Sequence, residues 1–394
     1  MEERYEKAWE WWRSIGSPTK IVAPMVDQSE LAFRMLCRDY GAELCYTPMI
    51  NSKVYVSDKT YRKEAKNDLS VEDRPLLIQI CGNDPEKMLE TALDLQDHCD
   101  GIDINLGCPQ GIAKKGNYGA FLLENFELLH EIVSTLTANL RVPVTCKVRK
   151  LPREEDTFRL VDTLVGAGAA MICMHGRLKE CRGEKVGPAD WATLRAVKAR
   201  CPVPVVLNGG VAGLGDVRRA LEETGVDGVM SSEAILENPG LFSGNVSSKS
   251  KTGQISDEYT YIQEYSELQL KYPNSVHHFR GHTFKILYKI LNCEENLDLK
   301  QRLTQARIPE IREIIQEIIA RKDPGHVQPE TPPAPVWYYR HRRHMIPTGV
   351  FLAHGSNGQP ALPSESKVED FFMDDDDGVV LSMFAAGGED GGDY

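Results

Sequence analysis

The sequence of 394 residues predicts an α/β protein: a (β/α)8 TIM barrel, then a small all-helical bundle, then a disordered acidic tail. Eight short apolar segments alternate with helical patterns over about 225 residues, which is the size and rhythm of such a barrel. After the eighth segment only helical patterns follow, and periodicity is then lost. A doubly wound sheet is the alternative, but eight regular units favour closure.

The expected strands are runs of apolar and β-branched residues bounded by proline, glycine and polar residues. They are residues 20–24, 44–47, 76–80, 101–105, 144–148, 171–175, 203–207 and 226–230. Helical patterns separate them at 30–40, from 84 onward, and at 124–138, 155–165, 191–200 and 214–223. Residues 51–74 are polar and are expected to form a longer connection.

Composition divides the chain into five parts. They are an N-terminal extension (1–18), the barrel (19–242), a polar linker (243–256), a helical domain (257–322) and a Pro-rich, acidic tail (323–394). In the helical domain we expect helices at 259–271, 276–291, 297–305 and 308–321. The tail combines proline-rich and acidic segments that cannot form a core.

Charge and cysteine content narrow the class of protein. The net charge of −12 seems to exclude a nucleic-acid partner, but residues 323–394 hold 4 Lys/Arg against 12 Asp/Glu and account for −8 of it. The remainder can therefore present a basic face. Ten cysteines without a Cys-x-x-Cys pair predict a reduced, metal-free, cytoplasmic protein. The charged N-terminus and the lack of a long apolar run predict neither a signal peptide nor a membrane span.

The stretch 103–119 is the strongest candidate for a catalytic site. An alternation of Ile102, Ile104 and Leu106 predicts a buried strand that runs into Gly107-Cys108-Pro109. Proline fixes φ and glycine permits a tight approach, so the thiol is held on a stiff turn beside the amide of Asn105. Lys114 and Lys115 follow in a segment expected to be a mobile basic loop. The alternative is that Cys108 is a small core hydrophobe, as most free cysteines are.

Polar residues stand at or just after the carboxyl ends of the expected strands. They are Pro24-Met25, Gln79, Asn105, Lys147, His175, Asn208-Gly209-Gly210 and Ser231-Ser232-Glu233. In a barrel this end is the active face. The last two groups follow strands seven and eight, where barrels commonly bind phosphate through backbone N–H groups.

The helical domain carries a second polar group of residues. His278 and His282 have i,i+4 metal spacing, but no third ligand is evident, so a solvated helix face is the preferred interpretation. Arg280, Lys285 and Lys289 are spaced so that they could follow a phosphate backbone. The basic run 340–344 in the tail is a weak signal for nuclear import or nucleic-acid binding, so a nuclear location besides the cytoplasm stays open.

Taken together, these motifs resemble the tRNA-dihydrouridine synthases. The resemblance covers residues 19–242 as the flavin barrel and about 257–322 as a tRNA-binding domain. It is carried by Asn105-Leu106-Gly107-Cys108-Pro109, Gly116-Asn117-Tyr118-Gly119-Ala120, Ala23-Pro24-Met25, Gln79, Lys147-Val148-Arg149, His175-Gly176-Arg177 and Asn208-Gly209-Gly210. Within the family the chain is most similar to the eukaryotic branch acting on uridines 16 and 17 of the D-loop.

The resemblance implies tightly bound FMN, with NADPH or NADH as reductant and tRNA as substrate. Hydride would pass from FMN N5 to uridine C6, and Cys108 would give a proton to C5. The implied cofactor residues are Ala23, Pro24, Met25, Gln79, Lys147, His175, Asn208, Gly209, Gly210, Ser232 and Glu233. The implied substrate residues are Asn105, Lys114, Lys115, Arg177, Arg280 and Lys285, with Lys150 as a further candidate. Ser232-Glu233 stands where many members carry Gly-Arg.

Two other functions are compatible with these residues. A flavin-dependent dihydropyrimidine or dihydroorotate-type dehydrogenase would share the barrel and the cofactor but act on a free base. A non-catalytic tRNA-binding protein could keep the fold without the chemistry. The helical domain argues against the first and Cys108 against the second. We expect a monomer.

Overall fold

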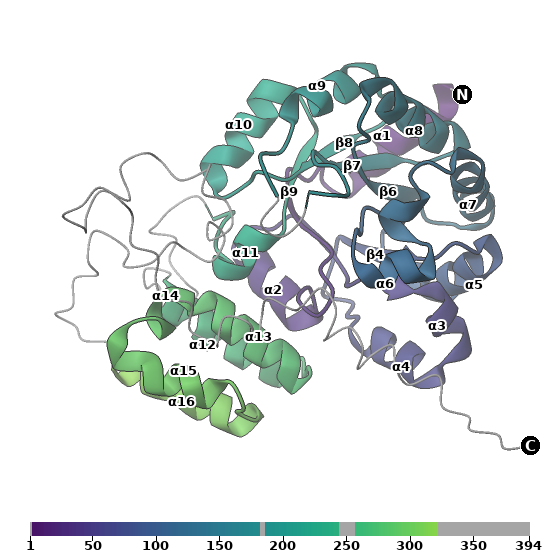
Figure 1. The fold of residues 1–394 in the computed structure, drawn as a ribbon. Coiled ribbons are helices and arrows are strands. Elements are labelled where there is room, and N and C mark those ends of the chain that lie inside the picture. The colour runs from purple at the N-terminus through teal and green to yellow at the C-terminus, as the bar shows by residue number, and fades with distance from the viewer. Residues whose placement is uncertain (1, 182–185, 244–256, 322–394) are drawn as a thin grey trace, which may run out of the picture.

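The computed structural model describes residues 2–181, 186–243 and 257–321 (Figure 1). The predicted tail 323–394, its basic run 340–344 and nearly all of the linker 243–256 lie outside the described residues. Within them the chain forms a closed barrel and a group of helices that lies against one side of it.

Nine parallel strands form one sheet. They are β1 Lys20–Val22, β2 Leu44–Tyr46, β3 Ile50–Asn51, β4 Leu76–Cys81, β5 Gly101–Leu106, β6 Val144–Arg149, β7 Met171–His175, β8 Val205–Asn208 and β9 Gly228–Ser231. Their order is β2-β1-β9-β8-β7-β6-β5-β4-β3, and β2 also pairs with β4. This last pairing closes eight strands into a ring, and the two-residue β3 only extends the end of β4. The predicted (β/α)8 barrel is confirmed.

The strand boundaries follow the sequence pattern to within two residues: β1 ends at Val22 instead of 24, and β8 and β9 both begin later than expected, β9 at Gly228 instead of 226. The strand expected at 203–207 begins instead at Val205. Pro202 and Pro204 explain the delay, because proline has no N–H to give to a neighbouring strand. Pro204 still accepts a hydrogen bond from Ile172 N through its carbonyl.

The helices around the barrel are those that the pattern predicts. They are α2 Leu31–Asp39, α5 Pro85–Leu95, α7 Phe126–Asn139, α8 Glu154–Ala167, α9 Trp191–Arg200 and α10 Leu214–Thr224, with a short α11 Glu233–Glu237 after β9. Asp84, Asn125 and Asp190 cap three of them by accepting from backbone N–H groups of the first turn. Short 3-10 helices follow α5 (Gln96–His98) and the helix α6 Gly111–Gly116 (Gly119–Leu122).

The N-terminal extension is a helix, α1 Glu2–Ser14. Its Trp12 is only 2% exposed and packs among inward-facing residues of the barrel, including Ile21, Leu44 and Val206. These residues belong to the amino-terminal half of the barrel interior. Trp12 therefore helps to fill the end of the barrel opposite the predicted site.

The prediction is wrong for two segments that were expected to be loops, because both contain helices. The polar connection 51–74 holds α3 Ser52–Ser57 and α4 Lys59–Asn67, whose first turns are capped by Asn51 and Asp58. The segment expected to be a mobile basic loop begins with α6 Gly111–Gly116, and Tyr118 after it is buried. In both segments the polar residues lie mainly on the exposed face of a short helix.

The helical domain comprises α12 Glu258–Lys271, α13 Val276–Ile286, α14 Tyr288–Leu291, α15 Leu297–Leu303 and α16 Ile308–Ala320, with a 3-10 turn at Glu294–Asn296. The single helix predicted at 276–291 is divided at Leu287. The domain docks on the barrel through α12 against α2 and α13 against α11 (Figure 1). Phe33 of α2 stacks on His282 of α13 with ring centroids 4.3 Å apart.

Candidate active site

The structure brings most of the predicted site residues to one rim of the barrel. All strands are parallel, so their carboxyl ends meet at the same mouth. The residues placed there are Ala23, Pro24 and Met25 after β1, Gln79 on β4, Asn105 and Cys108 on and after β5, Lys147 on β6, His175 and Arg177 on and after β7, Asn208 to Gly210 on and after β8, and Ser232 and Glu233 after β9.

The turn that carries Cys108 is held by side chains on both sides. Asn105 Oδ1 accepts from the backbone N–H of Gly107 (3.1 Å) and from that of Cys108 (2.9 Å). Arg149 donates from Nε to the Gly107 carbonyl at 2.8 Å, and Ala120 N donates to the Cys108 carbonyl at 3.0 Å. The half-buried thiol therefore stands on a turn whose peptide groups are restrained by hydrogen bonds.

A buried polar chain lies beneath this turn. Asn105 Nδ2 donates to Gln79 Oε1 (2.8 Å), and Gln79 Nε2 donates to Asp103 Oδ2 (2.8 Å). Thr145 Oγ1 donates to Asp103 Oδ1 at 2.6 Å. Burial raises the pKa of Asp103 to about 6, and the hydrogen bonds from Gln79 and Thr145 offset only part of that effect.

On the strands that follow β5 around the ring, β6 to β8, the rim carries cationic and polar side chains. Lys147 Nζ donates to Asn208 Oδ1 at 3.1 Å, and burial lowers the pKa of Lys147. Arg177 Nη1 lies 2.9 Å from His175 Nε2. Because a guanidinium only donates, this contact makes Nε2 the acceptor and places the proton of a neutral His175 on Nδ1. The rim thus carries the ammonium group of Lys147 and an imidazole that contacts the guanidinium of Arg177.

The backbone at the end of β8 requires glycine. Gly209 and Gly210 have positive φ (104° and 77°), and a Cβ on Gly209 would lie 2.7 Å from Cδ2 of His175. Trp191 Nε1 donates to the Gly209 carbonyl at 3.1 Å. Within the described part of the chain, the buried Oγ of Ser231 next to it has no hydrogen-bond partner. These features fit the phosphate end of a flavin mononucleotide, and the cations fit its ring edge.

Two residues with a structural role at the mouth were missed by sequence reasoning. Asp103 is the one ionisable residue of the buried strand β5, which is a signal that the sequence offers. Arg149 follows Lys147 at the period-2 spacing of a strand, so both point to the same side. Burial and then the charge of Arg177 lower the pKa of Arg149 to about 10.

The predicted RNA contacts are placed very differently from one another. Lys114 and Lys115 are exposed on α6 beside the mouth. Lys150 forms an ion pair with Asp190, and Arg177 is 5% exposed. Arg280 donates to the carbonyl of Thr304 (3.0 Å) and Lys285 is 7% exposed, both within the helical domain and away from the rim.

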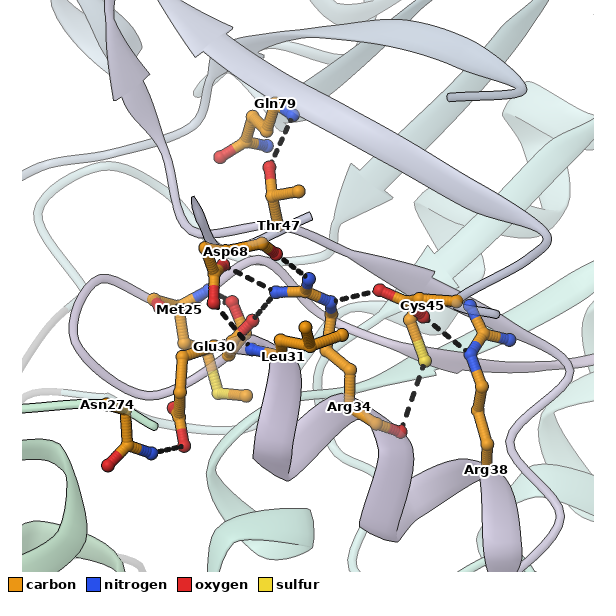
Figure 2. Close-up of polar contacts among 12 residues, drawn as sticks. Met25, Glu30, Leu31, Arg34, Arg38, Cys45, Thr47, Asp68, Gln79 and Asn274 are labelled. Carbon is orange, nitrogen blue, oxygen red and sulfur yellow. Dashed lines mark hydrogen bonds and ion pairs between the residues drawn. The ribbon is translucent and has the colours of Figure 1, made fainter. Parts of the chain in front are cut away.

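A cleft of about 510 Å³ lies between the barrel and the helical domain. It is lined by the loops after β1 and β2, by α4 and by residues 271–278, and it includes no predicted site residue. Thr47 connects it to the mouth, because its Oγ1 accepts from Gln79 N at 3.1 Å (Figure 2). Asp27, Glu30, Glu64 and Asp68 give it an acidic lining.

One wall of this cleft is fastened by Arg34, which is fully buried on α2. It donates to Asp73 (2.7 Å) and Asp68 (2.8 Å) and to the carbonyl of Ser29 (2.6 Å). Figure 2 shows Arg34 between Asp68 on one side and the strand of Cys45 on the other. These bonds fix the segment after α4 against the start of α2.

The solvated-face interpretation of the histidines in α13 is wrong for His282. This residue is 1% exposed, and its Nε2 lies 3.0 Å from Oε2 of Glu30. His278 Nε2 lies 3.5 Å from Asp27 Oδ1. Both face the barrel because α13 packs toward α11 and α2, so the i,i+4 spacing reflects a domain contact. Among the described residues no group of three or more His, Cys, Asp or Glu could hold a metal ion.

Comparison with known proteins agrees with this geometry. The Dihydrouridine synthase (Dus) family matches residues 21–321. A tRNA-dihydrouridine(16/17) synthase NAD(P)(+)-like protein of Rattus norvegicus is 41% identical over 334 residues, covering 83% of this chain and 74% of the relative. The tRNA-dihydrouridine(16/17) synthase of Saccharomyces cerevisiae is 40% identical over 328 residues (78% and 77%). A tRNA-dihydrouridine(20a/20b) synthase-like protein of Mus musculus is 34% identical over 232 residues (58% and 70%).

These matches confirm the resemblance seen in the sequence, and with it the enzyme class and the cofactors: a flavin-dependent oxidoreductase with FMN and NAD(P)H. No helix of the described residues is long and apolar enough to cross a membrane. The barrel, the thiol at its mouth and the helical domain all lie inside the matched range. The chain belongs to the dihydrouridine synthase family.

Proposed function

We propose that the protein reduces the C5–C6 double bond of uridines 16 and 17 in the D-loop of tRNA. The observation that carries this proposal is the half-buried Cys108 on a restrained turn after β5, at a mouth where the next two strands bring Lys147 and His175. The position within tRNA is supported by the relatives that match more of the chain at higher identity, which are tRNA-dihydrouridine(16/17) synthases.

FMN, when bound, supplies the hydride for C6 of the uracil and is reduced again by NAD(P)H. Gly209, Gly210 and Ser231 would hold its phosphate, with Ser232 and Glu233 nearby. Lys147 and His175 would offset negative charge at the ring edge. Pro24 and Met25 would form the apolar floor beside β1.

Cys108 would act as a general acid that donates the proton from Sγ to C5. A thiol with an ordinary pKa of about 8.5 is mostly protonated at neutral pH, which suits a donor. Asn105 holds the two amide N–H groups that define the turn, so the thiol keeps one position as the base arrives. The uridine must leave its stack to reach the mouth.

The RNA backbone would run over Lys114 and Lys115, which are exposed beside Cys108. The acidic cleft disfavours phosphate. Arg280 and Lys285 remain proposed contributors, although their side chains lie within the helical domain, so replacing them would also disturb its packing. Because one chain carries every proposed catalytic group, we propose a monomer, and a cytoplasmic location that can extend to the nucleus.

The decisive experiment replaces Cys108 with alanine. General-acid contributions run about 10²–10⁴-fold, so dihydrouridine formation in tRNA should fall by that factor. Flavin reduction by NADPH should be unchanged, because that half-reaction uses no proton from this thiol. Cys293→Ala, another half-buried thiol in the helical domain, is the matched control and should behave as the unmodified protein.

The same assay separates the other functions. Turnover of free uracil or orotate without RNA would favour a free-base dehydrogenase. A protein that binds tRNA but stays colourless under flavin loading would favour a non-catalytic binder. Wild-type turnover by Cys108→Ala would make Cys108 a core thiol and contradict the proposed acid. Mapping of the modified position in tRNA from cells lacking the protein tests the choice of uridines 16 and 17.

A further inference from the structure

We propose that Asp103 is a positioning residue for the reaction: its carboxylate orients the side-chain amide of Gln79, and through Gln79 and Asn105 it determines the geometry of the turn that carries Cys108. The inference rests on the proposed function for the role of Cys108. The contacts that carry it are confined to the barrel interior.

The first step is the contact between Asp103 and Gln79. An ionised carboxylate can only accept hydrogen bonds, and Asp103 Oδ2 lies 2.8 Å from the amide nitrogen of Gln79. The amide of Gln79 therefore has its N–H side toward Asp103 and its oxygen toward β5. Thr145 Oγ1 occupies the other oxygen of Asp103 at 2.6 Å, which holds the carboxylate in place.

The second step passes this orientation to the turn. Gln79 Oε1 can only accept, so the facing group of Asn105 must be its Nδ2, at 2.8 Å. The oxygen of Asn105 then points the other way and accepts from the N–H groups of Gly107 and Cys108. If Gln79 turned over, two oxygens would meet at one end of its amide and two N–H groups at the other.

Because these residues are buried, only one arrangement of their hydrogen bonds is favourable. Gln79, Asp103 and Thr145 are 0% exposed and Asn105 is 8% exposed, so bulk water cannot replace a missing partner. A buried polar group without a partner is costly, which leaves one arrangement of donors and acceptors. Asp103 itself does not reach the mouth, since Gln79 and Asn105 stand between it and Cys108.

The test compares two substitutions at Asp103. Asp103→Asn keeps an oxygen for Gln79 Nε2 and can donate to Thr145 Oγ1, so kcat for tRNA should stay within about threefold of the unmodified enzyme. Asp103→Leu removes the acceptor at similar volume. Its kcat should fall about tenfold or more while KM for tRNA changes little, because the misplaced thiol affects the reacting geometry.

A second measurement does not depend on turnover. Alkylation of Cys108 by iodoacetamide, resolved by peptide mass spectrometry, should be faster in Asp103→Leu than in the unmodified protein, because the loosened turn exposes the thiol. Asp103→Asn should match the unmodified protein. Asp100→Leu, immediately before the same strand, is the control and should lower Tm without changing this rate. If Asp103→Asn loses as much activity as Asp103→Leu, charge and not orientation matters, and the proposal is overturned.

If Asp103→Leu does not fold, the proposal can be tested by exchanging the acid and the amide between positions 103 and 105. Asn105→Asp alone places a carboxylate oxygen against Gln79 Oε1 and should lower Tm and speed alkylation of Cys108. Adding Asp103→Asn lets Gln79 turn over with every group paired, so the double variant should recover both values. Additive losses would refute the proposal. If Cys108→Ala keeps full turnover while this pattern of alkylation holds, the acid role fails and the positioning of the turn stands.

Discussion

Two fully buried carboxyl groups, Asp103 in the barrel and Glu30 at the contact with the helical domain, behave in opposite ways. Burial raises the pKa of Asp103 to about 6. Burial acts on Glu30 in the same direction, but His282 and Tyr265 outweigh it and hold its pKa at about 2. Burial alone therefore does not decide the charge of an acid in this protein.

The difference lies in what surrounds each group. Glu30 accepts from Tyr265 OH (2.6 Å), Asn274 Nδ2 (3.1 Å) and His282 Nε2 (3.0 Å), all from the helical domain. Asp103 accepts from one amide and one hydroxyl, both on neighbouring strands. The Nδ1 of His282 is buried with no partner in the described residues, and burial lowers the pKa of this imidazole, so the pair is a carboxylate and a neutral ring.

The two networks therefore serve different ends. The donors around Glu30 come from residues more than 230 positions away in the chain, so they hold two domains together. The donors around Asp103 orient neighbouring side chains within one domain. Removing Glu30 should separate domains, whereas replacing Asp103 should disturb chemistry.

The largest expected effect comes from Glu30→Ala. It leaves the buried donors Tyr265 and His282 without an acceptor, while Asn274 still donates to Tyr265, and it should lower the free energy of unfolding by about 3 kcal/mol, measured by urea denaturation. Glu64→Ala, an exposed carboxyl of the same cleft, is the control and should change it by less than about 0.5 kcal/mol. A Glu30→Ala protein as stable as the control would show that the domains dock without this network.

The pH dependence of the free energy of unfolding should have opposite sign for the two carboxyl groups. Glu30 ordinarily titrates near 4.5 and here near 2, so its stabilisation is present above pH 4.5 and is lost as pH falls toward 2. Asp103 titrates near 6 instead of 3.8, so its contribution is present below pH 3.8 and is lost as pH rises through 6. The measurement is the midpoint of urea unfolding as a function of pH. In Glu30→Gln the fall of the midpoint below pH 4.5 should disappear. In Asp103→Asn the fall of the midpoint between about pH 4 and 6 should disappear. If both variants lost the pH dependence in the same pH range, the two carboxyl groups would not differ as proposed.

The smallest effect is expected from Tyr265→Phe. One donor to Glu30 is lost while Asn274 and His282 remain, so the cost should be about 2 kcal/mol, the range for a hydrogen bond to a charged group. Thermal unfolding measures this cost. Tyr261→Phe on the same helix is the control, because the ring of Tyr261 packs against the ring of Tyr40. In the Glu30→Ala background Tyr265→Phe should cost less, and an unchanged cost would show that the hydroxyl acts elsewhere.

Much of the active face could be predicted from the sequence because a parallel barrel places all strand ends on one rim. Gln79, Asn105, Lys147, His175 and Asn208 were found in this way. The direction of each side chain could not be predicted so simply. Arg177, expected to contact RNA, is instead turned onto His175, and Lys285 is buried in its own domain.

By itself the sequence determined the fold class, the order of the elements and the turn at Gly107-Cys108-Pro109, because period-2 and helical patterns, prolines and glycines act locally. Only the tertiary structure decided which polar groups pair: Asp103 with Gln79 and Thr145, and Glu30 with Tyr265 and His282. Such pairings join residues on separate strands and helices. Their donors and acceptors are assigned only when burial removes water and each group must find its partner in the protein.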